Sequence, residues 1–210
     1  MSDAKQCGHQ AGKVTVPHED FLAKINAVRY AFLELGVEDG VIVARTDSLG
    51  AGLTQKIPVS KTPGDLADKY NGFLETVPVN SLEELKEGET LIHKEGKLFK
   101  TVRMPNGLYR FRDDSNSERV ILDCITSLQS GADLLWIETA VPNLKQISSL
   151  VNAIRTQVNK KQLFLLLFDL TSNICLVIFS VFTIIVCGRL IASMMMHKCT
   201  QIRKKFPLCH

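Results

Sequence analysis

The first 162 residues of this chain contain little cysteine, which argues against a disulfide framework. Only Cys7 and Cys124 lie in this stretch, whereas the remaining 48 residues hold the other four cysteines. Two isolated cysteines in a body of this size are typical of reduced thiols in a cytosolic-type compartment. The opening sequence MSDAKQCGHQ also lacks an apolar core, so we expect no secretory signal peptide.

The same stretch lacks an excess of basic charge. Residues 1–162 contain 20 Lys+Arg against 21 Asp+Glu, while residues 163–210 contain 5 against 1, so the formal net charge of +3 comes from the tail. A near-neutral body offers no basic face, and this argues against nucleic acid as a partner. The chain also lacks internal repeats. We therefore interpret residues 1–162 as one domain and residues 163–210 as a separate tail.

What the sequence does contain is an alternation of apolar strands and amphipathic helices. Short apolar runs predict strands over residues 40–47 and 132–139, and helical periodicity predicts helices over residues 16–36, 117–131 and 143–158. In the first helix the apolar stripe consists of Phe21, Ile25, Val28, Phe32 and Leu35. Strand, helix, strand, helix with nearly all-apolar strands predicts an α/β fold whose parallel sheet is covered by helices.

Residues 48–116, between these units, are interpreted as an insertion. Within it, residues 89–112 alternate apolar and polar side chains around Gly96 and a Pro-Asn-Gly turn. This pattern predicts a small antiparallel meander.

Polar side chains stand at the ends of the two predicted strands. Side chains two residues apart on a strand point the same way, so Arg45 and Asp47 share one direction, as do Trp136 and Glu138. Parallel α/β folds bind ligands at the carboxyl ends of their strands. A cation, two carboxylates and an aromatic ring at one rim suit a small polyanionic substrate and a hydrated divalent metal. The alternative is a simple ion pair between Arg45 and Asp47.

The segment AKQCGHQAGKV, residues 4–14, leaves three roles open for Cys7: a metal ligand, half of a disulfide, or a working thiol. Zinc needs three or four ligands, and Cys7 with His9 supplies two. A working thiol needs a lowered pKa, which Lys5 or a protonated His9 would favour. An inert cysteine is the alternative, because spacing alone does not decide.

Taken together, KQCGH, then GKV and VP, then VARTD and LLWIET resemble isocitrate lyase, of the isocitrate lyase/phosphoenolpyruvate mutase superfamily. The resemblance covers residues 4 to about 158, and the 48–116 segment looks like the extended insertion of a longer subgroup. WIET favours isocitrate lyase over the related methylisocitrate lyase. The resemblance implies a partial TIM-type (β/α)8 barrel and a retro-aldol cleavage of isocitrate into succinate and glyoxylate, with magnesium as cofactor.

The resemblance also implies roles for particular residues. Its motifs assign acid/base catalysis to Cys7 and substrate binding to Gly8, His9, Arg45, Trp136 and Glu138. Breaking the carbon–carbon bond leaves a carbanion delocalised onto a carboxylate, which needs cationic stabilisation and then a proton. For the parent enzyme, the resemblance implies a homotetramer in the cytoplasm, glyoxysome or mitochondrion.

Two parts of the family pattern are missing from this sequence. The family's metal-binding aspartate and first substrate loop precede KQCGH, where this chain has few residues, and no Asn-Ser-Pro-Ser loop follows residue 162. A barrel needs about eight strands to close. We therefore expect no direct metal ligand in this chain and no isocitrate cleavage by the chain alone.

The tail, residues 163–210, is hydrophobic and then basic. Residues 170–188 are 19 positions without charge. As a helix they would span roughly 29 Å, enough for a hydrocarbon core of ~30 Å. This predicts a C-terminal hydrophobic helix that would cross a membrane.

Beside the leading hypothesis of an isocitrate lyase fragment, three other interpretations stay open. The abrupt end of the resemblance could mark translated noncoding sequence, from a read-through intron or a frameshifted gene model. A genuine anchor would make the chain a membrane-tethered, non-enzymatic interaction protein that reuses a partial barrel. The chain could also be a fragment without a stable fold.

Overall fold

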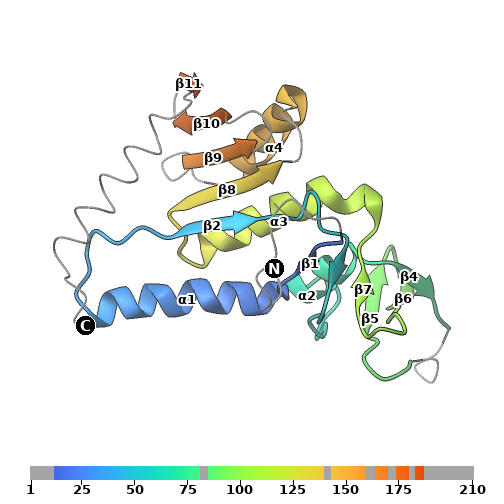
Figure 1. Ribbon diagram of the computed structural model, residues 1–210. Coiled ribbons are helices and arrows are strands. Elements are labelled where there is room, and N and C mark those ends of the chain that lie inside the picture. The colour runs from blue at the N-terminus through green and yellow to red at the C-terminus, as the bar shows by residue number, and fades with distance from the viewer. Residues whose placement is uncertain are drawn as a thin grey trace.

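A computed structural model of the chain describes residues 12–80, 85–139 and 143–158 with their side chains, and the backbone alone of residues 164–169, 174–179 and 183–186. The body is a β-sheet with long helices against it, and a smaller group of short strands lies at one end (Figure 1).

The main sheet consists of β2 (Val43–Thr46), β8 (Leu134–Thr139), β9 (Phe164–Asp169), β10 (Ile174–Phe179) and β11 (Thr183–Val186). The strand order is β11-β10-β9-β8-β2. Strands β2, β8 and β9 run parallel to one another, while β10 and β11 are added antiparallel. The two strands predicted from the sequence therefore form, and they pair in parallel as expected.

The long helices are α1 (His18–Glu34), α3 (Asn116–Gln129) and α4 (Leu144–Gln157), close to the three predicted spans. Helix α1 begins after Pro17, and Glu19 and Asp20 occupy its first turn, where the helix dipole favours anions. Asn143 caps the start of α4, and its side chain accepts hydrogen bonds from two backbone N–H groups of the first turn.

The core lies between β8 and the helices. Leu135 and Ile137 are 1% and 0% exposed, and they pack with apolar residues of the three helices, among them Ile25, Val120, Cys124, Leu150 and Ile154. Because side chains alternate along a strand, Trp136 and Glu138 point away from the helices. The fold thus leaves the opposite face of β8 to polar side chains at its carboxyl end.

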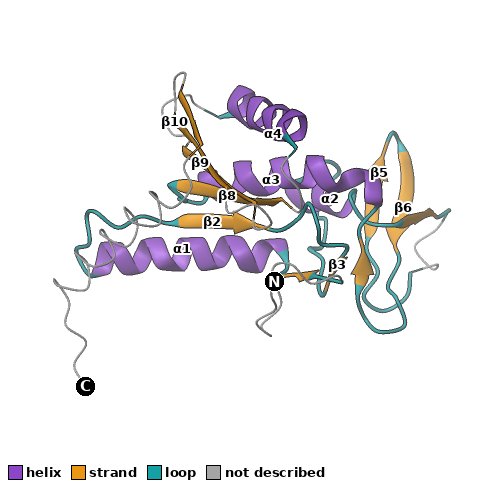
Figure 2. Cartoon of the chain, turned by 45° about the horizontal axis from the view of Figure 1, so that its top comes forward, coloured by secondary structure: helices purple, strands orange, loops and turns teal. Residues whose placement is uncertain are grey.

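The insertion contains α2 (Leu66–Asn71), a 3-10 turn (Asp113–Ser115) and the short strands β3 (Leu53–Thr54), β4 (Thr76–Pro78), β5 (Leu91–Lys94), β6 (Lys97–Thr101) and β7 (Tyr109–Arg110). Within the predicted meander, residues 89–112, strands β5 and β6 form an antiparallel hairpin, and its tight turn places Glu95 and Gly96 at positive φ. The third strand of this sheet is β4, from outside the predicted range, whereas β7 pairs with β3. Strand β3 pairs with β7 and with β1 (Val14–Thr15). The insertion lies beyond the carboxyl ends of β2 and β8 (Figure 2).

The prediction of a C-terminal hydrophobic helix is wrong for the described residues of the tail. Within 170–188, the described segments are the strands β10 and β11. Their sequences, ICLVIF and TIIV, are rich in β-branched and aromatic residues, which favour strands, and a continuous apolar run shows no period that separates helix from strand. Among the residues that the structure describes, no helix is long and apolar enough to cross a membrane.

The described strands form an open sheet, with β2 at one edge and β11 at the other. A parallel run of β2, β8 and β9 with connecting helices agrees with part of a (β/α)8 barrel. The antiparallel β10 and β11 depart from that pattern, because a TIM barrel is parallel throughout. The architecture is therefore α/β, and barrel closure stays a prediction.

Candidate functional site

Three residues predicted for the site meet at the carboxyl ends of β2 and β8. Arg45 and Trp136 are register partners across the two parallel strands. The Arg45 guanidinium lies 4.9 Å from the centre of the Trp136 ring, and its Nη2 lies 3.3 Å from Glu138 Oε2. The Trp136 indole Nε1 donates to the same Glu138 oxygen at 3.2 Å. Period-2 alternation and parallel pairing thus bring these side chains together, as expected.

Asp47 belongs to the same group, and it is bonded to Lys13, a residue that the sequence analysis did not single out. Arg45 donates to Asp47 through Nε and Nη2, both at 3.0 Å, so the simple ion pair considered above does form. It does not stand alone, because Lys13 Nζ also donates to Asp47 Oδ1 at 3.3 Å. The side chains of Lys13 and Asp47 are 10% and 8% exposed. The rim therefore holds two cations and two carboxylates, largely shielded from water.

The surroundings of Glu138 at this rim change its pKa. Burial raises the pKa of Glu138 above its ordinary value of 4.5, and the charge of Asp47 acts in the same direction. Arg45, Lys13 and the Trp136 hydrogen bond oppose the rise without cancelling it. Glu138 therefore keeps its proton to a higher pH than an exposed glutamate would.

This raised pKa predicts a pH dependence of stability. A carboxyl group with a raised pKa in the folded state stabilises the protein fully below the unfolded pKa, and this contribution is lost as pH rises through the folded pKa. We expect the free energy of unfolding of the wild type, relative to Glu138→Gln, to fall as pH rises from about 4.5. Urea titrations of both proteins across this range measure the difference.

Glu89 provides a control of opposite sign. Burial opposes its ionisation, but hydrogen bonds from Lys100, at 2.8 Å, and from the Lys86 N–H outweigh burial and lower the pKa of Glu89. Relative to Glu89→Gln, the wild type should gain stability as pH rises and lose it in acid. Equal pH profiles for Glu138→Gln and the wild type would contradict the electrostatic account of the rim.

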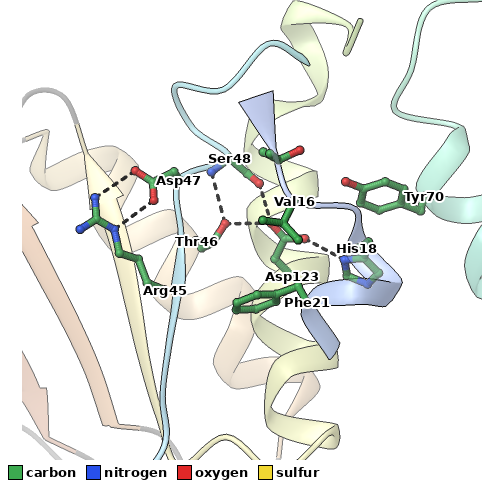
Figure 3. Close-up of a pocket in the computed structure, with 10 residues that line it drawn as sticks. Val16, His18, Phe21, Arg45, Thr46, Asp47, Ser48, Tyr70 and Asp123 are labelled. Atoms are coloured by element: carbon green, nitrogen blue, oxygen red, sulfur yellow. Dashed lines mark hydrogen bonds and ion pairs between the residues drawn. The ribbon is translucent and has the colours of Figure 1, made fainter. Parts of the chain in front are cut away.

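A pocket opens beside the rim, between the start of α1 and the loop after β2 (Figure 3). Arg45 and Asp47 lie on one side of the β2 backbone, and Thr46 and Ser48 point to the other, toward Asp123. The full lining is Thr15, Val16, His18, Phe21, Arg45, Thr46, Asp47, Ser48, Tyr70 and Asp123. One wall therefore comes from the insertion, through Tyr70 of α2.

The sequence analysis assigned no role to His18 or Asp123, which meet in this pocket. His18 is 4% exposed, its Nδ1 lies 3.2 Å from Asp123 Oδ1, and its ring stacks on Tyr70 at 4.7 Å. A signal was present in the sequence: Asp123 interrupts the apolar residues of the α3 helix, and a charge in that position needs a partner. The sequence does not indicate which residue that partner is.

The remaining predicted site residues, Cys7, Gly8 and His9, lie outside the described residues. The other body cysteine, Cys124, is buried in the core, where burial raises its pKa well above the ordinary value. A thiol in that state is inert.

No protein-family model matches this chain. Isocitrate lyase from Pseudomonas aeruginosa is 60% identical to it over 163 residues, which is 78% of this chain and 30% of that enzyme. The bifunctional glyoxylate cycle protein of Caenorhabditis elegans is 24% identical over 161 residues, or 77% of this chain and 13% of that protein. The mitochondrial 2-methylisocitrate lyase of Hypocrea atroviridis is 46% identical over 48 residues, or 23% of this chain and 8% of that enzyme.

Identity of this degree over most of the chain decides the family. The matched part of this chain is an isocitrate lyase segment. The resemblance stated from the sequence motifs is thereby confirmed. The chain spans less than a third of the length of the Pseudomonas aeruginosa enzyme.

Magnesium, which the isocitrate lyase family implies, does not fit the described side chains as direct ligands. Mg²⁺ prefers an octahedral set of oxygens with one or two carboxylates available. The described residues contain no group of three or more His, Cys, Asp or Glu that could hold a metal ion. At the rim, Asp47 is paired with Lys13 and Arg45, and Glu138 with Arg45 and Trp136.

Proposed function

We propose that this chain carries the carboxylate-binding part of an isocitrate lyase site and that it does not complete the cleavage by itself. The observation that supports this most is the convergence of Arg45, Trp136 and Glu138 at the carboxyl ends of two adjacent parallel strands. This is the edge at which α/β folds bind their ligands.

Arg45 is the residue proposed to bind a substrate carboxylate. A guanidinium is a planar fork that matches a carboxylate with two parallel hydrogen bonds. Stacking on Trp136 and pairing with Asp47 limit the rotamers of Arg45, so less entropy is lost when a ligand binds. Lys13 and Arg45 share the carboxylate of Asp47, so that carboxylate neutralises the guanidinium only in part, which favours a polyanion such as isocitrate.

For the chemical step, the proposed role of Cys7 is to exchange a proton with the succinate fragment. Isocitrate loses the proton of its hydroxyl group to solvent water, the carbon–carbon bond breaks, and glyoxylate forms as an aldehyde. The bonding electron pair moves onto the succinate carbon and delocalises into its carboxylate. The Cys7 thiol then delivers a proton to that carbon. Gly8 and His9 are proposed substrate contacts in the same loop.

A homotetramer and a location in the cytoplasm, glyoxysome or mitochondrion belong to the same proposal. They are inferred from the family alone. For the Cys-Gly-His loop, the connection to the described structure is Lys13, which follows the loop in the chain and donates to Asp47 at the rim.

The proposed function predicts binding without turnover. The purified 210-residue chain, with magnesium present, should bind isocitrate yet form no more glyoxylate than a Cys7→Ala variant. The described strands form an open sheet with two strands at the rim, and such a sheet does not surround the reacting carbons and exclude water from them, as cleavage requires. Trapping glyoxylate as its phenylhydrazone measures turnover, and isothermal titration measures binding.

Two results would contradict the proposal in different ways. Glyoxylate formation above the Cys7→Ala background would show that the chain is a complete catalyst. Absence of isocitrate binding, in a chain that shows a cooperative thermal transition by circular dichroism, would remove the substrate assignment.

A further inference from the structure

One face of helix α3 forms hydrogen bonds to the loop that follows β2, residues 47–51. Arg119 and Asp123 are four residues apart in α3, so they lie on the same face of the helix. Both reach the loop through side-chain hydrogen bonds. Arg119 donates hydrogen bonds to carbonyl groups of the loop, and Asp123 accepts hydrogen bonds from the hydroxyl groups of Thr46 and Ser48.

Asp123 accepts hydrogen bonds from the hydroxyl groups of both neighbours of Asp47. Thr46 Oγ1 donates to Asp123 Oδ2 at 2.8 Å, and Ser48 Oγ donates to the same oxygen at 2.5 Å. The other oxygen, Oδ1, lies 3.2 Å from His18 Nδ1. An ionised carboxylate only accepts hydrogen bonds, so it matches the two hydroxyl donors that converge on Oδ2, and it matches His18 in the tautomer that carries a proton on Nδ1. Thr46 and Ser48 are 8% and 4% exposed, so water cannot easily replace this partner.

Arg119 holds the backbone of the same loop. It is 0% exposed, and its Nη2 donates to the carbonyl oxygens of Ser48 and Ala51, the latter at 2.6 Å. Its guanidinium lies 3.7 Å from the centre of the Phe111 ring, which belongs to the insertion. The loop is therefore fixed through its hydroxyl groups by Asp123 and through its carbonyl groups by Arg119.

These contacts continue into the rim. With Thr46 and Ser48 both bound to Asp123, the backbone of Asp47 between them is fixed, and its carboxylate is directed to the opposite side of the strand (Figure 3). There Asp47 holds Arg45, which lies over Trp136.

We propose that Asp123 is a positioning residue, which sets the orientation of the Arg45 guanidinium through the Thr46–Ser48 turn. Arg119 supports the same turn from its carbonyl side. What Arg45 binds rests on the proposed function, but the positioning itself can be tested without a ligand.

Trp136 makes this test possible, because it is the only tryptophan in the chain. Its fluorescence reports on the rim alone. In the native state at 25 °C, Asp123→Asn should raise the acrylamide quenching constant of Trp136 roughly twofold, because a neutral amide oxygen accepts the two hydroxyl hydrogen bonds more weakly than a carboxylate oxygen, and an NH2 group replaces the oxygen that faces His18. Ser48→Ala, which removes one of the two hydroxyl donors, should give a smaller rise, and the double variant should not exceed Asp123→Asn by much.

Two control variants separate positioning from a general loss of stability. Asp114→Asn removes a carboxylate with a side chain that is 74% exposed, and it should leave quenching unchanged. Ile147→Val weakens the core between α4 and the sheet and leaves the hydrogen bonds of Asp123 and Arg119 in place, so it should lower the unfolding midpoint but not change native-state quenching. Ser48→Ala also serves if Asp123→Asn fails to fold.

Wild-type quenching in both Asp123→Asn and Ser48→Ala would overturn the proposal, as would an equal rise in Ile147→Val. Isocitrate titrations then separate this inference from the proposed function. Roughly tenfold weaker binding in Asp123→Asn, with Arg45 intact, supports positioning. If the wild-type chain does not bind isocitrate, the proposed function is contradicted. The quenching comparison still decides the role of Asp123.

Discussion

Replacing Arg45 by alanine is expected to weaken isocitrate binding by at least roughly 30-fold, because truncating one member of a shielded charge pair costs about 2–5 kcal/mol of binding free energy. Arg45 is the rim cation that stacks on Trp136, and its loss leaves Asp47 and Glu138 facing the incoming carboxylates. Isothermal titration of the wild type and of Arg45→Ala with isocitrate measures the change in Kd.

Arg29→Ala is a matched control for this substitution. Arg29 also forms a short ion pair, at 2.7 Å with Asp133, and it also lies near an aromatic ring, that of Phe32. Asp133, however, precedes β8, at the opposite end of the strand from Glu138. Arg29→Ala should leave the Kd for isocitrate within about twofold of the wild type, as expected for a site this distant. Equal losses of affinity in both variants would show that the effect of Arg45→Ala is structural.

Ile137→Ala is expected to lower the free energy of unfolding by about 2–5 kcal/mol, the range for truncating a fully buried isoleucine. Ile137 is 0% exposed and lies in β8 between Trp136 and Glu138, on the side that faces the helices. The cavity would lie directly beneath the rim. Urea unfolding followed by Trp136 fluorescence measures both the stability and the environment of the site.

Val43→Ala is the matched β-strand control, because Val43 is 38% exposed in β2. Its cost should stay near about 0.5 kcal/mol, as for most surface substitutions. If Ile137→Ala and Val43→Ala had the same effect on the unfolding free energy, the packing of β8 against α3 and α4 would not be the core of this protein.

The adjacency of Arg45, Trp136 and Glu138 could be predicted from the sequence because it follows from local rules. A strand has a side-chain period of two, and parallel strands end at the same edge. Once residues 40–47 and 132–139 are assigned as parallel strands, the polar residues at their ends have to meet.

The contacts that orient this rim could not be predicted in the same way. Asp123 lies 77 residues from Thr46 and 75 from Ser48, and Lys13 lies 34 residues from Asp47. The helical pattern shows that Asp123 belongs to an inward-facing helix, but it does not show which loop crosses that helix. Such pairings depend on the tertiary packing of α1, β2 and α3.

Apolar patterns misled the prediction in two places. The tail run shows no period, and its described segments continue the sheet as β10 and β11, where β9 already pairs with β8. Val28 of α1 and Leu35, which follows the last helical residue Glu34, belong to the predicted apolar stripe, yet they are 43% and 76% exposed. Sequence periodicity identifies apolar positions, but burial also needs a neighbouring element on that side.

We propose that the Cys7 loop and the ends of β2 and β8 face one carboxylate pocket. Alkylation of the full chain by iodoacetamide, followed cysteine by cysteine through peptide mass spectrometry, tests this most directly. Saturating isocitrate should slow the modification of Cys7 severalfold and leave that of Cys199 unchanged, and Arg45→Ala should abolish the protection. Modification of Cys7 at the same rate with and without isocitrate, in a wild-type chain that binds it, would contradict the account.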